Sequence, residues 1–210
     1  AGLLLAVLLN QKVRAMPIFR TFFYLPSIVP LVASSMLWLW ILNPQYGLLN
    51  NILQKLGLYQ PNWLTDPRFT KPALLIMGVW GVGSIMIIFL AALQDVPRTL
   101  YEAAEIDGCT PGQMFRRITL PLIRPILVYV VITSMIGGLQ MFDVPQILTN
   151  GKGSPDRCAT TMIMYLNNHM YSKNYGMAGA VSTVLFLVCA VLCIAVLKTL
   201  DRSKEGGAGK

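Results

Sequence analysis

Four long apolar stretches, separated by loops that carry most of the charge, constrain the fold of this chain more than any other feature. The stretches are Phe22–Leu42, Ala73–Leu93, Ile126–Phe142 and Met177–Thr199. A helix needs about 20 mainly apolar residues to cross the core of a bilayer, and these stretches are at or near that length. Only 12% of the 210 residues are charged, whereas soluble domains carry about 25%. The sequence therefore predicts an all-α membrane protein, a polytopic bundle of transmembrane helices.

A fifth apolar stretch, Ala1–Leu9, is too short to span a bilayer. It has neither the basic region nor the leading Met of a secretory signal peptide. We expect it to be the end of a helix whose beginning lies outside this sequence, which makes the chain N-terminally truncated. Residues 1–199 are then expected to form one transmembrane domain, and the polar, glycine-rich tail 200–210 is expected to be disordered and cytoplasmic.

The net charge of +8 follows the loops and does not point to nucleic acid. Most of the 17 Lys and Arg residues fall on the side of the loop 94–125. Loops rich in Lys and Arg are typical of the cytoplasmic side of a membrane. The bias therefore places the loop 94–125 inside and the loops 43–72 and 143–176 outside.

The inner loop 94–125 has the signals of two short helices joined by a fixed turn. Pro97 suits the first turn of a helix, and Arg98–Asp107 contains good helix formers. Gly108 suits the left-handed position after the helix. The run Thr110-Pro111-Gly112-Gln113 predicts a capping box that starts a second helix, and Pro121 is expected to stop that helix.

The first of these helices has an acidic character that is unusual for a membrane-surface connector. Leu100, Ala103 and Ala104 form a small apolar face, flanked by Glu102 and Glu105. Connectors that lie on anionic lipid usually expose Lys and Arg instead. The alternative of a plain amphipathic connector is therefore less favoured than a surface on which a partner protein docks.

The same loop carries the residues of a known motif. The run Glu102-Ala103-Ala104, then Gly108, then Ile118-Thr119-Leu120-Pro121 resembles the EAA motif of ABC-importer permeases, in particular those of the carbohydrate-uptake branch. The segments Phe22–Pro26, Trp80–Gly83 and Phe142-Asp143 are also similar to that branch. Cys109 departs from the family pattern, in which Ala is usual. The ATPase-coupling residues that the resemblance implies are Glu102, Ala103, Ala104, Asp107, Gly108, Leu120 and Pro121.

This resemblance implies an ABC type I importer permease fold and a multi-pass protein of the bacterial cytoplasmic (inner) membrane. It implies that the subunit is not an enzyme, and no catalytic residue, cofactor or metal is expected. Two separate ABC ATPase subunits, a second homologous permease subunit and an extracytoplasmic solute-binding protein are the expected partners, in addition to membrane lipid. The solute could be a sugar, an oligosaccharide or glycerol phosphate.

Polar and aromatic residues inside the apolar stretches are candidates for a translocation path, because such residues are costly in lipid. The candidates are Trp80, Ser84, Tyr129, Ser134, Gln140 and Asp143. The alternative for each is a contact between helices, where Ser, Gly and Gln are common. The pair Gly137-Gly138 predicts a break or a close helix contact within Ile126–Phe142.

Two other function classes remain as alternatives. An ion-coupled secondary transporter would show inverted repeats and a carboxylate deep in the membrane, but no repeat is evident and Asp143 lies near the end of its stretch. A membrane enzyme would need a cluster of His, Asp or Glu, and the sequence holds one His and nine acidic residues in all. His169 is more simply a surface residue, and Cys189 and Cys193 are more simply buried apolar contacts.

Overall fold

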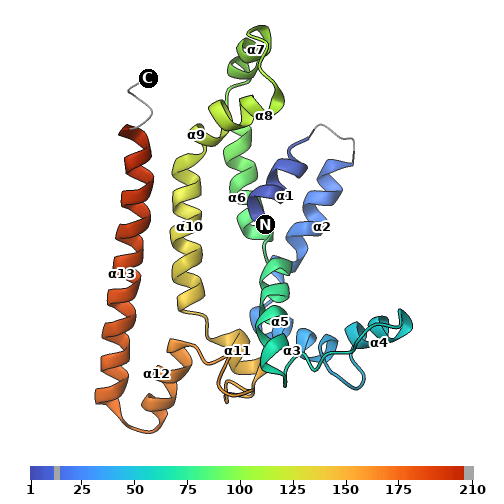
Figure 1. The fold of residues 1–210 in the computed structure, drawn as a ribbon, viewed down its shortest axis with the longest axis vertical. Helices are drawn as coiled ribbons and strands as arrows, with labels where there is room; N and C mark the ends of the chain where they lie inside the picture. The colour runs from blue at the N-terminus through green and yellow to red at the C-terminus, as the bar shows by residue number, and fades with distance from the viewer. Residues whose placement is uncertain (12–14, 206–210) are drawn as a thin grey trace. The chain divides into compact units, whose positions relative to one another are not determined.

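The computed structural model describes residues 1–11 and 15–205, with side chains up to residue 198, and regular structure in these residues is helical. Figure 1 shows the individual helices, and these belong to two compact units. The first unit contains Ala1–Ile28, Trp80–Thr133 and the chain from Val196 onward, and the second contains Val29–Val79 and Ser134–Ala195. The prediction of an all-α membrane fold is confirmed.

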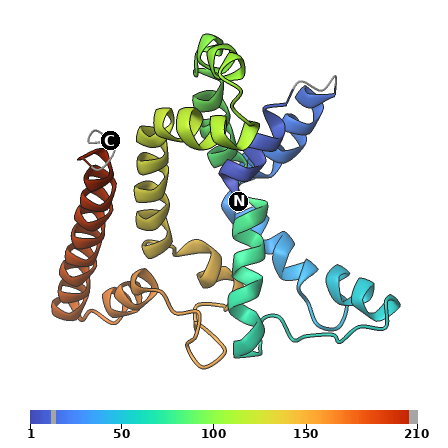
Figure 2. The same cartoon turned by 45° about the horizontal axis from the view of Figure 1, so that its top comes forward.

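The first unit is built around helix α6 (Gly83–Gln94). Helices α1 (Gly2–Leu9) and α2 (Met16–Ile28) both pack against α6, as the two views in Figures 1 and 2 show. The buried core contains Ala6, Leu9, Met16, Met86, Phe89, Leu90, Leu93, Val96, Ile123 and Val130. Ile123 and Val130 bring the start of α10 (Arg124–Leu139) into this core. One apolar core therefore joins α1, α2, α6 and the first half of α10.

Helices α2 and α6 approach closely at Gly83. A Cβ atom at Gly83 would lie 2.5 Å from the carbonyl oxygen of Phe23 and 2.9 Å from the Cα of Tyr24. Both distances are shorter than van der Waals contact, so this position needs a residue without a side chain. Small residues at helix interfaces allow backbones in a membrane protein to pack this closely.

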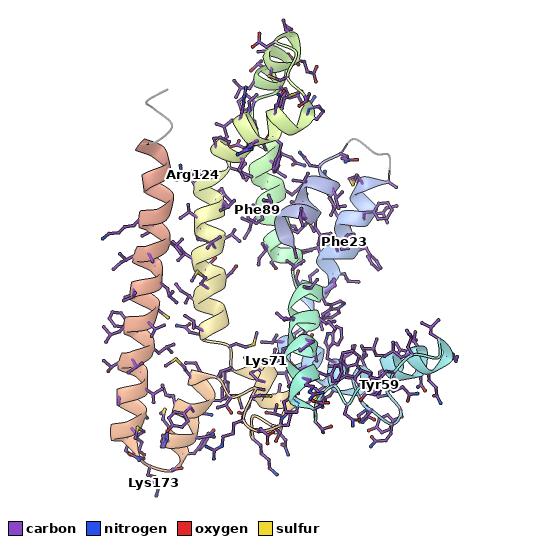
Figure 3. The ribbon with its side chains drawn as sticks, viewed as in Figure 1. Phe23, Tyr59, Lys71, Phe89, Arg124 and Lys173 are labelled. Carbon is purple, nitrogen blue, oxygen red and sulfur yellow. The ribbon has the colours of Figure 1, made fainter. Side chains whose placement is uncertain are left out.

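The second unit contains α3 (Leu31–Ile41), α4 (Leu48–Lys55), α5 (Pro67–Trp80) up to Val79, the end of α10 from Ser134, α11 (Asp143–Leu148), α12 (Met162–Tyr171) and most of α13 (Tyr175–Glu205). Helix α11 packs against α3. The loop around α4 is held by buried Asn50, which donates to the carbonyls of Pro44 (3.2 Å) and Pro61 (3.1 Å) and accepts from Trp63 Nε1 (2.8 Å). The ring of Tyr59, labelled in Figure 3, lies 6.1 Å from that of Phe69.

The helix boundaries differ from the predicted apolar stretches. By length and composition, Arg124–Leu148 and Tyr175–Lys198 could each cross a membrane, and two further pairs, α2 with α3 and α5 with α6, could do so if each pair is one broken span. Helix α13 runs on to Glu205, so residues 200–205 are helical where a disordered tail was expected. Residues 206–210 of that tail lie outside the described part of the chain.

Proline and glycine explain why two predicted stretches are divided. The stretch Phe22–Leu42 is split between α2 and α3, with Pro30 as the N-cap of α3. Proline has no N–H and its ring clashes with the preceding helical turn, so α2 does not continue through it. The stretch Ala73–Leu93 is split at Gly81-Val82, between α5 and α6, where glycine weakens a helix.

The glycine pair in the third predicted stretch behaves differently. Helix α10 continues through Gly137-Gly138 to Leu139, and a Cβ atom at either glycine would meet nothing within 4 Å. The predicted break or close contact at this pair is therefore wrong for this chain. Glycine costs a helix about 1 kcal/mol relative to alanine, a cost that a long apolar helix can absorb.

Candidate functional site

The loop after α6 begins with α7 (Arg98–Ile106), which ends at a glycine turn. Gly108 has φ +73°, the left-handed conformation expected from the sequence. The Gly108 N–H donates to the Glu105 carbonyl (3.0 Å), and the Cys109 N–H donates to the Ala104 carbonyl (2.9 Å). These two bonds form a Schellman motif. They fix the direction in which the chain leaves α7.

The chain then turns directly into α8 (Pro111–Met114). The predicted capping box is present, and Gln113 Oε1 accepts a hydrogen bond of 2.8 Å from the Thr110 N–H. Pro111 takes the first helical position, where a missing N–H costs nothing. Only Cys109 and Thr110 lie between the Gly108 turn and α8, so the angle between the two helices is set by local hydrogen bonds.

The second helix does not stop at Pro121, which corrects the prediction. After α8 the chain forms a π-helical segment, η1 (Phe115–Thr119), and then α9 (Leu120–Leu122), which contains Pro121. The Leu120 N–H reaches back to the Phe115 carbonyl, five residues earlier. The wider turn places Pro121 in the first turn of a new α-helical stretch, where its missing N–H has no cost. The chain thus continues through Ile123 into α10.

Side chains fasten α7 to this base. The Tyr101 hydroxyl lies 2.7 Å from Thr119 Oγ1, which joins α7 to η1 by a hydrogen bond. Thr119 is buried, and both Tyr101 and Ile118 pack against the core of the first unit. Packed side chains therefore connect α7 to the core that contains α6 and the start of α10.

The outward face of α7 differs in part from the prediction. Glu102, Ala103 and Asp107 are exposed, but Ala104 is buried. The most exposed apolar residue is Ile106, whose side chain is 88% accessible. Sequence reasoning missed Ile106, although it follows Glu102 by four residues and so lies on the same helix face. The face is thus an isoleucine surrounded by carboxylates.

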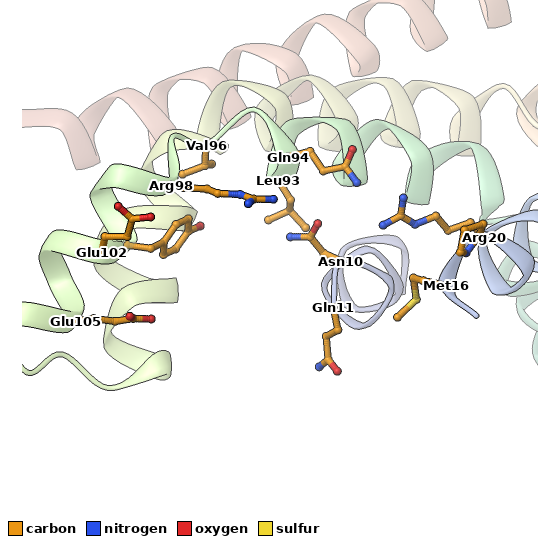
Figure 4. Close-up of a pocket in the computed structure, with 12 residues that line it drawn as sticks. Asn10, Gln11, Met16, Arg20, Leu93, Gln94, Val96, Arg98, Glu102 and Glu105 are labelled. Carbon is orange, nitrogen blue, oxygen red and sulfur yellow. The ribbon is translucent and has the colours of Figure 1, made fainter. Parts of the chain in front are cut away.

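A polar pocket of about 820 Å³ lies beside this helix, within the first unit. Glu102, Glu105 and Arg98 line it from α7, and Arg20 and Asn10 line it from the α1 and α2 side (Figure 4). The Arg20 guanidinium donates to the Leu9 carbonyl at 2.9 and 3.2 Å. Glu102 and Glu105 on α7 therefore share one pocket with Arg98 and Arg20.

The other predicted coupling residues lie in the base of the loop. Leu120 is partly exposed and Pro121 is exposed, and both belong to α9. They are separated from α7 along the chain by α8 and η1. Their place is at the junction between the loop and α10.

The candidate path residues are distributed over both units. In the first unit, Trp80 ends α5, Ser84 lies in the first turn of α6, and Tyr129 on α10 is 56% exposed. In the second, Ser134 is exposed on α10, Gln140 follows that helix, and Asp143 is the exposed first residue of α11. Their role in a path stays a prediction.

Metal-ligating groups do not gather in the described residues, where no three His, Cys, Asp or Glu side chains could hold one ion. His169 lies on α12, with its ring 4.6 Å from that of Tyr165 in an edge-to-face contact. Both residues line a second pocket, together with Lys152 and Arg157.

A comparison with known families identifies the family to which this chain belongs. Residues 1–205 match the model of the family described as binding-protein-dependent transport system inner membrane component. The chain belongs to this family. The resemblance seen in the sequence is therefore confirmed.

Individual relatives agree with this assignment. The chain is 38% identical over 197 residues to the lactose transport system permease protein LacF of Rhizobium radiobacter, an alignment that covers 91% of this chain and 66% of the relative. It is 35% identical over 198 residues to the trehalose/maltose transport system permease protein MalF of Thermococcus litoralis, covering 94% of this chain and 66% of the relative. The chain thus spans about two thirds of the length of these relatives.

A solved structure shows the same fold. A chain of a bacterial ABC transporter involved in the import of the acidic polysaccharide alginate superposes with a TM-score of 0.79 at 25% identity, over 96% of this chain and 71% of that one. A second structure of a bacterial alginate ABC transporter, in complex with a periplasmic protein bound to an alginate pentasaccharide, gives a TM-score of 0.78 at 26% identity, over 96% and 69% of the two chains. These comparisons give no support to the ion-coupled alternative.

Proposed function

We propose that this chain is the permease subunit of an ATP-driven importer and that it forms part of the translocation path for a sugar or a related polar solute. Its relatives include permeases of lactose and of trehalose/maltose transport systems. A second homologous permease, two ABC ATPase subunits and an extracytoplasmic solute-binding protein complete the proposed assembly. In this proposal the chain is a multi-pass protein of the bacterial cytoplasmic membrane, and its loop 94–125 lies on the cytoplasmic side.

The observation that carries this proposal is the construction of α7. An exposed Ile106, next to Glu102 and Asp107, offers an apolar anchor ringed by acid. An anchor of this kind suits a pocket lined by basic residues on a partner. Because Tyr101 and the Gly108 turn hold α7 firmly to its base, a push on the anchor becomes a rigid shift of α6 and α10. Such a shift is how a permease could alternate its access between the two sides.

Energy for this movement is proposed to come from the separate ATPases. The look-alike Gly151-Lys152-Gly153-Ser154 lacks the spacing of a P-loop. It forms a turn after α11 rather than the entry to a helix. The chain is therefore proposed to bind no nucleotide of its own, and its part in the cycle is mechanical.

Co-purification tests the proposal. The full-length permease is expressed with its partner permease and the candidate ATPase, captured in detergent, and assayed for bound ATPase and for ATP hydrolysis coupled to uptake. The variants are Gly108→Val, Glu102→Lys and Ile106→Asp. Gly108→Val puts a β-branched residue at φ +73°, which costs about 1–2 kcal/mol and should tilt the turn. The wild type should retain the ATPase, and the variants should lose it or hydrolyse ATP without uptake.

Gly112→Ala is the matched control. Gly112 lies in the same loop, on α8, and a Cβ atom there meets nothing within 4 Å. This variant should bind the ATPase and support uptake like the wild type. If the wild-type complex never retains an ATPase, or if all three variants transport normally, the proposed function is wrong.

A further inference from the structure

A second pocket, of about 580 Å³, lies wholly within the second unit, between the loop that follows α11 and helix α12. Lys152 and Arg157 line it from the loop, and Tyr165, Asn168 and His169 line it from α12. No carboxylate is among its lining residues. Asp156 is the single acidic residue between Thr149 and Gly176 in the sequence. The pocket therefore has a net positive charge.

The loop that presents Lys152 is firmly built. Buried Thr149 donates to the Pro145 carbonyl (2.6 Å) and accepts from the Gly153 N–H (2.9 Å). The Gly151 N–H donates to the Gln146 carbonyl at 2.8 Å. Gly151 and Gly153 have φ of +74° and +63°, and a Cβ atom at Gly153 would collide with Thr160. The backbone on both sides of Lys152 is thus fixed before any ligand arrives.

The two cations are available to a ligand. Lys152 and Arg157 are exposed, and neither side chain makes a hydrogen bond or an ion pair with the described residues of the chain. The edge-to-face rings of Tyr165 and His169 form a wall of the pocket beside them. An unneutralised Lys and Arg at a preformed pocket favour a carboxylate, to which Arg can donate two parallel hydrogen bonds.

We infer that this pocket receives an acidic side chain of the solute-binding protein. The inference rests on the proposed function, which puts this loop on the extracytoplasmic side, where that protein docks. Membership of a binding-protein-dependent family makes such a partner necessary. Because both cations are exposed at the rim of an open pocket, a protein surface can reach them directly. Opposite charges at such a contact speed association and fix the orientation of the partner.

The test measures binding of the solute-binding protein to the complete transporter in nanodiscs, by biolayer interferometry at low and high salt. Lys152→Glu and Arg157→Glu should each weaken binding about tenfold or more at low salt, and the difference should shrink at high salt. Lys152→Arg keeps the charge and should bind like the wild type. Basal ATP hydrolysis and subunit composition should be unchanged in all variants.

Lys173→Glu is the matched control. Lys173, labelled in Figure 3, follows α12 on the same outer loop but does not line the pocket. If it weakens binding as much as Lys152→Glu, the effect is general attraction and the inference is overturned. Normal binding by the Lys152→Glu and Arg157→Glu variants overturns it as well.

A competition experiment distinguishes the two possible sources of a carboxylate, an acidic side chain of the solute-binding protein and an acidic solute. Acetate and glucuronate are added at equal concentrations, because both offer a carboxylate and only glucuronate carries a sugar ring. Equal weakening of protein binding by the two is expected. If glucuronate alone displaces the protein, and does so only when Lys152 and Arg157 are present, the pocket is a site for acidic solute and the inference is wrong. Failure of the wild-type complex to bind any solute-binding protein would instead overturn the proposed function.

Discussion

At the scale of single residues, the hydrogen bond between Tyr101 and Thr119 is the contact that most directly ties α7 to its base. The two oxygens lie 2.7 Å apart, and Thr119 is buried. Without the tyrosine hydroxyl, Thr119 keeps a buried polar group with no partner. We therefore expect this bond to contribute both to stability and to the proposed transfer of movement.

We predict that Tyr101→Phe lowers the free energy of unfolding by about 1 kcal/mol and reduces the uptake obtained per ATP hydrolysed. Thermal unfolding of the purified assembly and a coupled uptake assay would measure the two effects. Tyr46→Phe is the control, because Tyr46 is 61% exposed and its hydroxyl makes no hydrogen bond with the described residues. Equal coupling ratios in Tyr101→Phe and the wild type would show that this bond does not transmit movement.

The residues of α7 also show what sequence can reveal about a site. The Gly108 turn and the Thr110–Gln113 box were predicted correctly, because each depends on residues within one helical turn of itself. Ala104 was expected on the docking face and is buried instead. Which side of a short helix faces inward depends on Tyr101 and Ile118 meeting the core of α6 and α10, and no local pattern records that meeting.

At the scale of elements, the close contact between the backbones of α2 and α6 at Gly83 leads to a prediction about stability. Gly83→Ala should lower the melting temperature of the purified protein, since its Cβ would have to displace the backbone of Phe23 and Tyr24. Overpacking of this kind costs about 1–3 kcal/mol. Differential scanning fluorimetry in detergent would measure the change.

Gly78→Ala is the control for this variant. Gly78 lies within α5, and a Cβ atom there meets nothing within 4 Å. Since alanine favours a helix by about 1 kcal/mol over glycine, Gly78→Ala should leave the melting temperature unchanged or raise it. A Gly83→Ala protein as stable as Gly78→Ala would contradict the close approach.

Element boundaries were the weakest part of the sequence prediction. Apolar length found the helices, but it could not show that Pro30 and Gly81 would divide two of the stretches while Gly137-Gly138 would divide none. Pro121 was expected to end a helix and instead follows a π turn. In each case the outcome depends on whether neighbouring turns supply hydrogen-bond partners for the backbone N–H and C=O groups. That depends on the packing around the segment and not on one residue.

At the scale of the whole molecule, the proposed orientation in the membrane rests on the distribution of charge and can be tested with the native cysteines. Cys109 lies in the turn after α7, Cys158 lies in the loop before α12, and both are partly exposed. In variants that keep one of these two cysteines and have alanine at the others, a membrane-impermeant maleimide should label Cys158 in intact cells. It should label Cys109 only after the membrane is permeabilised.

Labelling of denatured protein controls for the reactivity of each thiol. Labelling of Cys109 in intact cells, with Cys158 protected, would show the opposite orientation and would place α7 on the side of the membrane that lacks the ATPase.

The candidate path residues also belong to the scale of the whole molecule. A translocation path depends on how the segments and subunits are arranged. Sequence positions alone therefore do not locate the path among the candidates Trp80, Ser84, Tyr129, Ser134, Gln140 and Asp143.

The π turn at Phe115–Thr119 has a consequence for how this chain can change in length. It holds one residue more than an α-helical turn would. Deletion of one residue there would let the segment close as an ordinary α-helical turn, so that α10 would keep its direction. Pro121 would then stand inside a continuous α-helix, where its ring clashes with the carbonyl four residues earlier. The extra residue of the π turn therefore gives the chain the room to pass Pro121 without a break in the helix.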